Sequence, residues 1–287
     1  MNFEAFIREI QDNHWKVHGV EVYVQGKCIH AYADTKNRYP IYSATKTITS
    51  LAVGMAVDEG KLNIRESLLH YLPDSVIKEM QTSQRECYQN ITIKDLLTMS
   101  VSGYPFRPEG NYWLKDSLSV PVKIKKENKF SYNNTSAFLA GVAATNALNE
   151  NLYDYLCRKL FAPLGIENPP CEFSPEGYFY GASKMELSVN ELSRIGLLIS
   201  QSGVYQGTRI VSDAYIKEAT SLQQQNSEDG YGYLIWKYRN GVSINGKWNQ
   251  RCYILPNREI VITYLADTDM DASILRKQME KHLLSVV

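Results

Sequence analysis

Residues 40–62 read PIYSATKTITSLAVGMAVDEGKL, with a serine three positions before a lysine at the start of an apolar run typical of a helix. Two side chains spaced by three lie on the same face of a helix, so we expect Ser43 and Lys46 to be neighbours. A serine hydroxyl is a poor nucleophile unless a base accepts its proton, and a desolvated lysine is such a base. The small and apolar residues 48–57 predict a deeply packed helix, whose first backbone N–H groups would stabilise an oxyanion. The stretch therefore predicts a serine nucleophile with an amine base.

The same spacing also arises by chance in this chain. Ser75-Val76-Ile77-Lys78 follows the residues His-Tyr-Leu-Pro-Asp, a pattern typical of a surface turn, and we assign it no role. Spacing alone does not separate a catalytic pair from a coincidence. The interpretation of Ser43 therefore depends on other segments.

Two distant segments carry side chains that would complete such a site. In KFSYNNTSAFLAGVAA, residues 129–144, Tyr132 and Asn134 stand at a turn into an apolar helix. A phenol can relay a proton, and an amide can orient a lysine and a substrate carbonyl. Taken alone, this pattern is more typical of a turn with a packed tyrosine, since the chain has 20 tyrosines. Gly246 lies within a strand-like run, where a glycine often marks the close approach of a backbone or a ligand.

The two ends of the chain predict strands. Residues 19–33 read as a hairpin around Gln25-Gly26-Lys27, and residues 231–245 as a hairpin around Asn240-Gly241. Residues 250–267 give two more strands around Pro256-Asn257. Short amphipathic helices are predicted at both ends, over residues 3–14 and 271–285.

The middle of the chain predicts helices. Thr92, Ser188 and Ser212 are plausible N-caps, and Thr92 with Asp95 resembles a capping box. We therefore expect an α+β fold, in which an antiparallel sheet built from both ends is flanked by the terminal helices and a mostly helical lobe is inserted. The predicted lobes are residues 1–60 with 215–287, and residues 61–214. The active site would lie in the cleft between them.

Composition excludes several classes of protein. Of the 287 residues, 44% are hydrophobic and 22% charged, and 31 Lys and Arg balance 31 Asp and Glu. This balance does not favour a nucleic acid or an anionic membrane as partner. The longest apolar runs are too short to cross a bilayer, which takes about 20 residues. The first residues lack the pattern of a secretory signal, so we expect a cytoplasmic protein.

Neither the cysteines nor the histidines predict a metal site. The cysteines are odd in number and never spaced as Cys-x-x-Cys, and no Glu or third ligand accompanies the His14 and His18 pair at a zinc-site distance. We therefore expect no metal and no cofactor, and reduced thiols at Cys28, Cys87, Cys157, Cys171 and Cys252.

The Ser-x-x-Lys, Tyr-x-Asn and strand-glycine motifs, in this order, resemble the serine β-lactamase and penicillin-binding-protein superfamily. Further stretches resemble the branch that contains class C β-lactamases, related carboxylesterases and 6-aminohexanoate-dimer hydrolases. These stretches are YSATKTITSLAVGMAVDEGKLNIRESLLHYLPD, ITIKDLLTMSVSGYP, FSYNNTSAFLAG, LFAPLGI and GYGYLIW. The resemblance runs through nearly the whole chain and implies a β-lactamase/transpeptidase-like fold.

The resemblance also implies a role for each matching residue. Ser43 would be the acylated nucleophile, and Lys46 would accept its proton. Tyr132 would act as the phenolic acid and base, and Asn134 would bind Lys46 and the acyl side of the substrate. The backbone N–H groups of Ser43 and Lys247 would form the oxyanion hole.

The chain departs from the family pattern on the strand. Ile244-Asn245-Gly246 stands where β-lactamases have Lys-Thr-Gly and many esterase relatives have His-x-Gly, and Asn249 replaces a glycine. Isoleucine cannot receive a β-lactam carboxylate, so we do not expect efficient β-lactam hydrolysis. Acyl transfer is still expected, because Gly246 and the backbone donors persist, with Asn245 beside the substrate.

The expected function is therefore that of a serine hydrolase acting through an acyl-enzyme on a small ester or amide. The aromatic candidates for an acyl pocket are Tyr104, Trp113 and Trp248, although packing is the usual role of such residues. A penicillin-binding-like protein that is acylated but turns over poorly is the alternative, supported by the altered strand motif. A partner-binding role would require the Ser43, Lys46 and Tyr132 set to be an inherited remnant. The sequence carries no signal for an oligomeric state.

Overall fold

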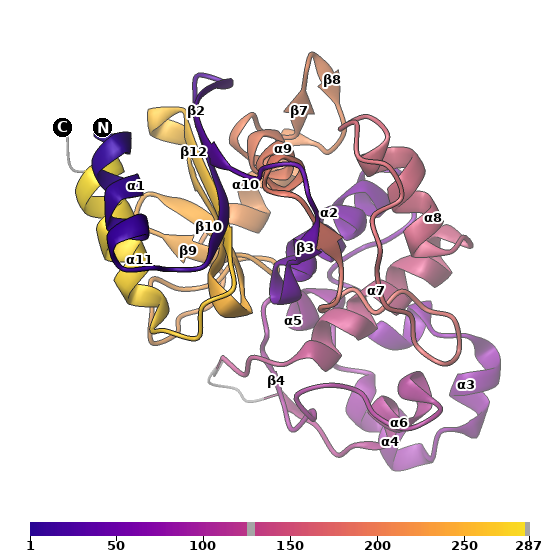
Figure 1. Ribbon diagram of the computed structural model, residues 1–287. Coiled ribbons are helices and arrows are strands. Elements are labelled where there is room, and N and C mark those ends of the chain that lie inside the picture. The colour runs from indigo at the N-terminus through magenta and orange to yellow at the C-terminus, as the bar shows by residue number, and fades with distance from the viewer. Residues whose placement is uncertain (125–129, 285–287) are drawn as a thin grey trace.

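A six-stranded antiparallel sheet, with strand order β2-β1-β12-β11-β10-β9, joins the two ends of the chain (Figure 1). The computed structural model describes residues 1–124 and 130–284. The strands are β1 (Val17–Val24), β2 (Lys27–Ala33), β9 (Trp236–Tyr238), β10 (Gly241–Gly246), β11 (Gln250–Leu255) and β12 (Ile260–Ala266). Strand β1 pairs with β12, so the predicted antiparallel sheet built from both ends is confirmed.

The terminal helices cover one face of this sheet. Helix α1 (Phe3–Asp12) packs beside α11 (Ala272–Met279) and the π-helical turn η6 (Glu280–Leu284). Their apolar residues form a core with alternate residues of the strands, among them Phe6, Leu275, Val22 and Tyr264. The two helices lie together at one side of the molecule, where the chain begins (Figure 1). The predicted terminal helices are thus confirmed, and residue 285 of the second prediction lies outside the described residues.

The opposite face of the sheet packs against helices from the middle of the chain. Helix α9 (Val189–Ser200) lies on β1, β11 and β12. Gly196 permits this approach, since a Cβ there would lie 2.5 Å from Cys252 Sγ. Beyond α9, helix α2 (Thr45–Asp58) packs against α7 (Asn134–Leu148). Helix α2 is buried on all sides, which explains why its sequence is apolar rather than amphipathic.

Shorter helices and strand pairs complete the described structure. The helices are α3 (Asp74–Glu79), α4 (Thr82–Tyr88), α5 (Ile93–Leu97), α6 (Trp113–Ser119), α8 (Leu152–Leu156) and α10 (Asp213–Thr220). The paired strands are β3 (Tyr39–Pro40) with β6 (Glu186–Leu187), β4 (Val101–Ser102) with β5 (Lys123–Ile124), and β7 (Val204–Tyr205) with β8 (Thr208–Arg209).

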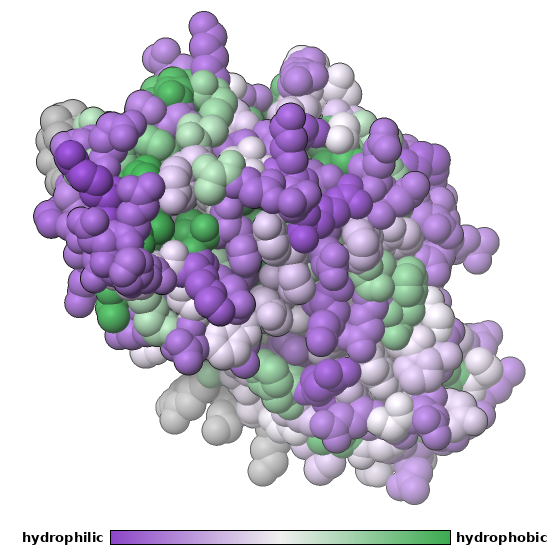
Figure 2. Space-filling model, in the orientation of Figure 1, coloured by the Kyte–Doolittle hydropathy of each residue, from purple (hydrophilic) through white to green (hydrophobic). Residues whose placement is uncertain are grey.

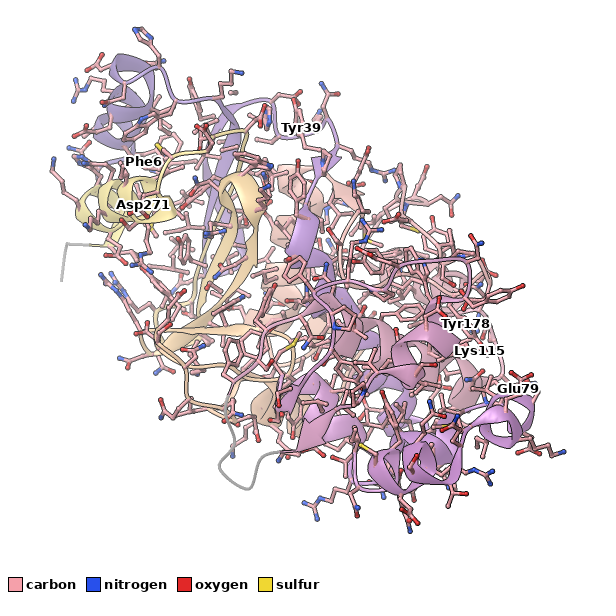
Figure 3. The ribbon with its side chains drawn as sticks, turned by 90° about the horizontal axis from the view of Figure 1, so that it is seen from below. Phe6, Tyr39, Glu79, Lys115, Tyr178 and Asp271 are labelled. Atoms are coloured by element: carbon pink, nitrogen blue, oxygen red, sulfur yellow. The ribbon has the colours of Figure 1, made fainter. Side chains whose placement is uncertain are left out.

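The predicted helix starts are confirmed by cap geometry. Thr92 and Ser188 form capping boxes with Asp95 and Glu191, and the Ser212 side chain accepts a hydrogen bond from the Tyr215 N–H. The second Ser-x-x-Lys pair lies in α3, where both side chains are exposed. That helix is remote from the sheet, next to the Glu79–Lys115 ion pair at the far end of the molecule (Figure 3).

The predicted hairpins form, with one shift of register. The first turn is Gln25-Gly26, where both residues have positive φ, and the last two strands are joined through Pro256 to Glu259. In the hairpin of β9 and β10, the turn is Arg239-Asn240 rather than Asn240-Gly241, because Gly241 pairs with Tyr238. Gly241 is required inside the strand, since a Cβ there would lie 2.1 Å from the Ile254 carbonyl oxygen.

The visible surface is mostly hydrophilic, with small hydrophobic patches (Figure 2). None of the helices within residues 1–124 and 130–284 has both the length and the apolar character that a membrane crossing requires. The division into lobes at residues 60 and 215 stays a prediction.

Candidate active site

The nucleophile candidate stands just before the buried helix α2. Tyr42–Ala44 forms a 3-10 turn, η1, and the α-helix follows from Thr45. Tyr42 has a φ of 49°, in the left-handed region that costs a non-glycine residue about 1–3 kcal/mol. The Thr45 hydroxyl donates to the Tyr42 carbonyl at 2.7 Å and helps to hold this turn. As a result, Ser43 is half-buried and lines a cavity instead of packing into the core.

Lys46 is enclosed and points toward Ser43. Its side chain is 1% exposed, and its Nζ lies 3.2 Å from Ser43 Oγ. The same nitrogen donates to Asn134 Oδ1 at 2.5 Å and to the Ala182 carbonyl at 2.9 Å. The cluster contains no carboxylate that would balance a charge on this amine, and burial lowers the pKa of Lys46 to about 7. A substantial fraction of the amine is therefore neutral near pH 7.

Asn134 is fixed from both sides. It is the first residue of α7, whose N-cap Asn133 accepts a hydrogen bond from the Ser136 N–H. The Asn134 side chain donates from Nδ2 to the Tyr180 hydroxyl at 2.8 Å while its Oδ1 accepts from Lys46. The Asn134 amide can therefore not rotate without breaking one of these bonds.

Tyr132 lies next to this pair. The Lys46 Nζ is 4.9 Å from the centroid of the Tyr132 ring. Burial raises the pKa of Tyr132 to about 12, although contact with the Ser43 hydroxyl and the charge of Arg251 oppose the rise. The phenol therefore keeps its proton at neutral pH. Its ring packs against Trp236 and Tyr231, at centroid distances of 5.4 and 6.3 Å, and this contact fixes its position.

The end of strand β10 runs against the turn that carries Ser43. A Cβ on Gly246 would lie 2.1 Å from the Ile41 carbonyl oxygen, so only glycine permits this approach. Ile244 is completely buried in the core on one side of the strand, whereas Asn245 lines the cavity. The Asn245 Oδ1 has no hydrogen-bond partner among the described residues.

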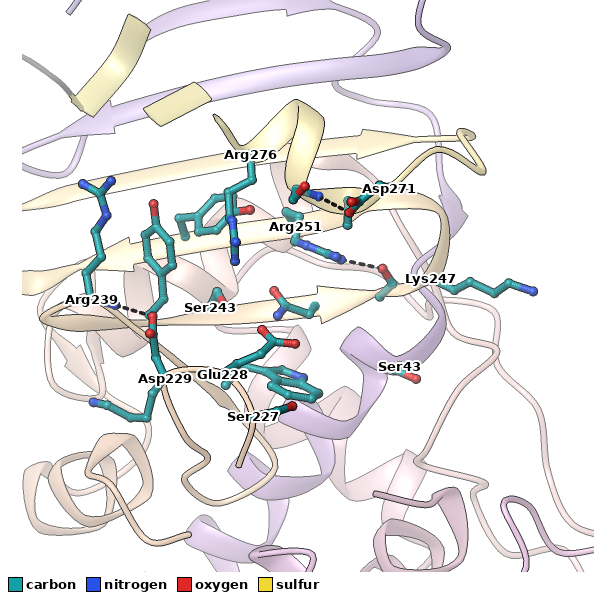
Figure 4. A pocket seen from close by; sticks show the side chains of 18 of the residues that line it. Ser43, Ser227, Glu228, Asp229, Arg239, Ser243, Lys247, Arg251, Asp271 and Arg276 are labelled. Atoms are coloured by element: carbon teal, nitrogen blue, oxygen red, sulfur yellow. Dashed lines mark hydrogen bonds between the residues drawn. The ribbon is translucent and has the colours of Figure 1, made fainter. Parts of the chain in front are cut away.

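Lys247 follows Gly246 and begins a tight turn into β11. Its side chain is exposed, stacks over the Trp248 ring at 4.3 Å and points away from the cavity (Figure 4). Only its backbone is thus available at the site. Trp248 and Asn249 both have positive φ, 61° and 66°. Asparagine tolerates this region better than most residues, which explains how Asn249 can replace a glycine.

Buried amides tie this turn to the end of β12. The Asn249 side chain is 2% exposed and donates to Thr268 Oγ1 at 2.7 Å. The Gln250 Nε2 donates to the Ala266 carbonyl at 2.5 Å, and its Oε1 accepts from the Ala266 N–H at 3.3 Å. These contacts fix the backbone on the C-terminal side of Lys247.

A cavity of about 790 Å³ opens from Ser43 along the sheet (Figure 4). Tyr132, Trp236, Asn245 and Arg251 are among its lining residues. Tyr104, Trp113 and Trp248, the sequence-based candidates for an acyl pocket, do not line it. Tyr104 and Trp113 are instead buried in the core, and Trp248 belongs to the turn described above.

The structure adds residues that the sequence did not single out. Tyr180 and the Ala182 carbonyl complete the surroundings of Asn134 and Lys46, and Trp236 and Arg251 line the cavity. Tyr180 was one of 20 tyrosines, and a backbone carbonyl has no sequence signal at all. The described residues contain no group of three potential metal-ligating side chains.

Comparison with known proteins gives one family and many similar folds. A family model described as Beta-lactamase matches residues 4–278. A Bacillus anthracis protein provisionally named as a 6-aminohexanoate-dimer hydrolase is 16% identical, with a TM-score of 0.78, over 97% of this chain and 80% of that chain. A Bacteroides dorei protein provisionally named as a beta-lactamase is 14% identical, with a TM-score of 0.79, over 99% of this chain and 98% of that chain. A penicillin-binding protein from Bacillus halodurans is 13% identical, with a TM-score of 0.74, over 96% of this chain and 99% of that chain. These likenesses show the predicted β-lactamase/transpeptidase-like fold.

Proposed function

The chain belongs to the Beta-lactamase family, and from this premise we propose that it is a serine hydrolase that forms an acyl-enzyme on Ser43. Its substrate would be a small ester or amide. The family match and the fold support a hydrolase, and the contacts of Ser43 support the assignment of the nucleophile.

The proposal rests on the protonation states of Lys46 and Tyr132 around Ser43. A neutral lysine amine has two N–H groups and one lone pair, and the Asn134 Oδ1 and Ala182 carbonyl accept two hydrogen bonds from Nζ. The lone pair is then free for the Ser43 hydroxyl, 3.2 Å away. Lys46 accepts the Ser43 proton as the oxygen attacks the substrate carbonyl. Because the raised pKa keeps Tyr132 protonated, its phenol is suited to give a proton to the leaving group.

The oxyanion would be stabilised by two backbone N–H groups. Gly246 at the end of β10 lies against the Ile41 carbonyl just before η1, so in the proposed mechanism the N–H of Lys247 would face the same space as that of Ser43. Hydrogen-bond donors fixed in advance lower the barrier of acyl transfer, commonly by about 3 kcal/mol per donor. Water then attacks the acyl-enzyme and releases the acid, with Lys46 and Tyr132 again exchanging protons.

Covalent labelling tests this proposal directly. Intact mass spectrometry after treatment with a fluorophosphonate should show one added group on the wild-type protein and none on Ser43→Ala. The Ser75→Ala variant is the matched control, since it removes the exposed serine with the same Ser-x-x-Lys spacing and should still be labelled. Hydrolysis of 4-nitrophenyl butyrate should be lost with Ser43→Ala, by about a thousandfold or more. Labelling that persists in Ser43→Ala would remove the nucleophile assignment.

A penicillin-binding-like role is the second candidate, favoured by the burial of Ile244. Because this side chain is buried in the core, the strand offers no cation at that position. In this case a penicillin would form a Ser43 adduct that persists for hours, and 4-nitrophenyl esters would give one burst without turnover. Continued release of nitrophenolate beyond one equivalent would favour the hydrolase.

A further inference from the structure

One arginine of the cavity wall binds the backbone at the end of strand β10. Arg251 lies on β11, opposite Asn245 in the register of the sheet. Its Nη1 donates to the carbonyl oxygen of Gly246 at 2.6 Å and to that of Gln250 at 2.9 Å. The first of these bonds is drawn in Figure 4. Because the two carbonyls flank the tight turn Lys247–Asn249, Arg251 joins both sides of this turn at its base.

The carbonyl of Gly246 and the N–H of Lys247 belong to one peptide group. This peptide is trans and planar, so its carbonyl and its N–H point in opposite directions. A donor that holds the carbonyl therefore also sets the direction of the N–H. Gly246 lies against the carbonyl of Ile41 as well. The peptide group is thus confined between Arg251 and the turn that carries Ser43.

The charge of Arg251 also acts on this peptide group. Hydrogen bonds from a charged donor are about twice as strong as those between neutral groups. A cation at the carbonyl oxygen draws electron density toward that oxygen, so the N–H of the same peptide becomes a stronger donor. Such polarisation strengthens each bond in a chain of hydrogen bonds by about 10–30%. The effect passes through the backbone and requires no contact between Arg251 and a substrate.

Acidic side chains of the same cavity wall have other partners. Glu280 pairs with Arg239 at 3.1 Å, and Asp271 accepts a hydrogen bond from the Ser273 N–H. Arg251 itself is half-buried, which limits the screening of its charge by water. Its charge is therefore felt at the two carbonyl oxygens that it contacts.

The turn after Gly246 depends on side chains to hold its shape. Trp248 and Asn249 both have positive φ, a region that side chains other than glycine adopt only when the surroundings enforce it. The buried amides of Asn249 and Gln250 hold the C-terminal side of the turn. On the N-terminal side, Arg251 holds the peptide that precedes the turn.

We propose that Arg251 is a positioning residue for the oxyanion hole, because its guanidinium orients and polarises the peptide between Gly246 and Lys247. The Lys247 N–H is then a fixed and strengthened donor to the oxyanion. This inference rests on the proposed function and assigns Arg251 a role in every reaction at Ser43, whatever the charge of the substrate.

Removal of the guanidinium should lower kcat and leave KM nearly unchanged, because an oxyanion donor acts in the transition state. Arg251→Met loses the charge and the donors at similar length and should reduce kcat for 4-nitrophenyl butyrate about tenfold. Arg251→Lys keeps the charge and should retain more of kcat than Arg251→Met. An unchanged kcat in Arg251→Met, or a loss that appears in KM alone, would overturn the inference.

Arg209→Met is the matched control for this substitution. Arg209 also donates from Nη1 to two backbone carbonyls, those of Ser202 and Val211, but it does not line the cavity. We expect its kcat to equal that of the wild-type protein. A loss in Arg209→Met as large as that in Arg251→Met would reduce the effect to general destabilisation and count against the inference.

A charged ester separates this role from direct contact with the substrate. The compounds are 4-nitrophenyl butyrate, which is neutral, and 4-nitrophenyl hemiglutarate, which carries a carboxylate on the acyl side and has the same leaving group. Because the effect passes through the peptide, Arg251→Met should reduce kcat for the neutral ester as much as for the charged one. A loss confined to the charged ester would show that the guanidinium acts on the substrate, and the inference would fail.

Nuclear magnetic resonance tests the peptide without any reaction. Glycine precedes lysine at three places in the chain, at Gly26-Lys27, Gly60-Lys61 and Gly246-Lys247. Protein made with ¹³C-carbonyl glycine and ¹⁵N lysine therefore gives three correlated signals, and Lys247→Arg identifies the third by removing it. In Arg251→Met the carbonyl resonance of Gly246 should move upfield, because its hydrogen bond is lost, while the other two signals stay in place.

The resonance and the kinetics together distinguish the two proposals. A Gly246 signal that moves in Arg251→Met supports the polarised peptide even if no ester is hydrolysed at Ser43. A signal that does not move would overturn the inference even if Ser43 is acylated. Hydrolysis that survives Ser43→Ala would instead contradict the proposed function.

Discussion

Lys46 Nζ donates a hydrogen bond of 2.5 Å to Asn134 Oδ1, although the two residues are 88 positions apart in the chain. This contact joins the start of α2 to the start of α7. It neutralises no charge, since an amide carries none, so the lysine is buried with polar partners only. The consequence is a lowered pKa and an amine that can act as a base near neutral pH.

The rate of acylation should therefore rise with pH. Lys46 accepts a proton only when it is neutral, and its pKa is about 7. We expect kcat/KM for 4-nitrophenyl butyrate to follow a single ionisation near pH 7 and to level off roughly one to two pH units above it. Lys46→Ala should lose this ionisation together with about a thousandfold or more of the rate. A profile that is flat from acidic to alkaline pH in the wild-type protein would show that Lys46 is not the base.

The stability of the fold should depend on the same ionisation. Between the folded pKa of about 7 and an unfolded value of about 10.4, the unfolded chain binds more protons at Lys46 than the folded chain does. The free energy of unfolding should then increase with pH, by at most about 1.4 kcal/mol per pH unit from this group. Below the folded pKa both states are protonated, so this contribution no longer changes with pH.

Lys46→Met provides the comparison for this stability effect. Urea unfolding measures the free energy of unfolding of both proteins at about pH 6, 7.5 and 9, which span the ionisation. The slope of this free energy against pH is then compared between the two proteins. We expect the wild-type protein to gain stability relative to Lys46→Met as the pH rises. Parallel pH dependences would mean that Lys46 titrates normally in the folded protein.

Tyr132→Phe should affect substrates according to their leaving groups. The pKa of about 12 keeps the phenol protonated, so in the proposed mechanism it would serve a leaving group that needs a proton. Alkyl esters and anilides should lose about a hundredfold in kcat, whereas a 4-nitrophenyl ester should lose much less, because nitrophenolate leaves as an anion. Tyr231→Phe is the control, since its ring packs against Tyr132 but it does not line the cavity. A loss that is equal for all leaving groups would assign Tyr132 a structural role.

The conformation of the turn after Lys247 should depend on Asn249 for two reasons that can be tested separately. Asn249 adopts a φ of 66° and donates to Thr268. Asn249→Gly keeps the backbone conformation but loses the hydrogen bond, whereas Asn249→Ala loses both. We expect kcat to fall about tenfold more for Asn249→Ala than for Asn249→Gly, with KM nearly unchanged, because the oxyanion donor proposed at Lys247 would act in the transition state. Thr268→Val should match Asn249→Gly, and equal activity of the alanine and glycine variants would contradict the argument.

The sequence by itself determined the elements of this fold and the identity of the site motifs. Apolar residues at every second position predicted strands at both ends of the chain, and apolar residues at helical spacing predicted helices between them. Such patterns are visible in the sequence because each element buries the side chains of one face. The helix N-caps at Thr92, Ser188 and Ser212 could be predicted because each capping hydrogen bond joins residues only three positions apart. The order of Ser43-x-x-Lys46, Tyr132-x-Asn134 and Gly246, together with the matching stretches along nearly the whole chain, led to the family.

Only the tertiary structure decided how these elements meet. The hairpin register at Gly241 followed from the approach of Ile254 on a neighbouring strand, which the local turn signal does not contain. The partners of Lys46 include a backbone carbonyl, and Arg251 faces the cavity only because β11 pairs beside Asn245. Contacts of this kind depend on segments far apart in the chain, and the physical properties that follow from them, including burial and the pKa of Lys46, exist only once those segments have packed together.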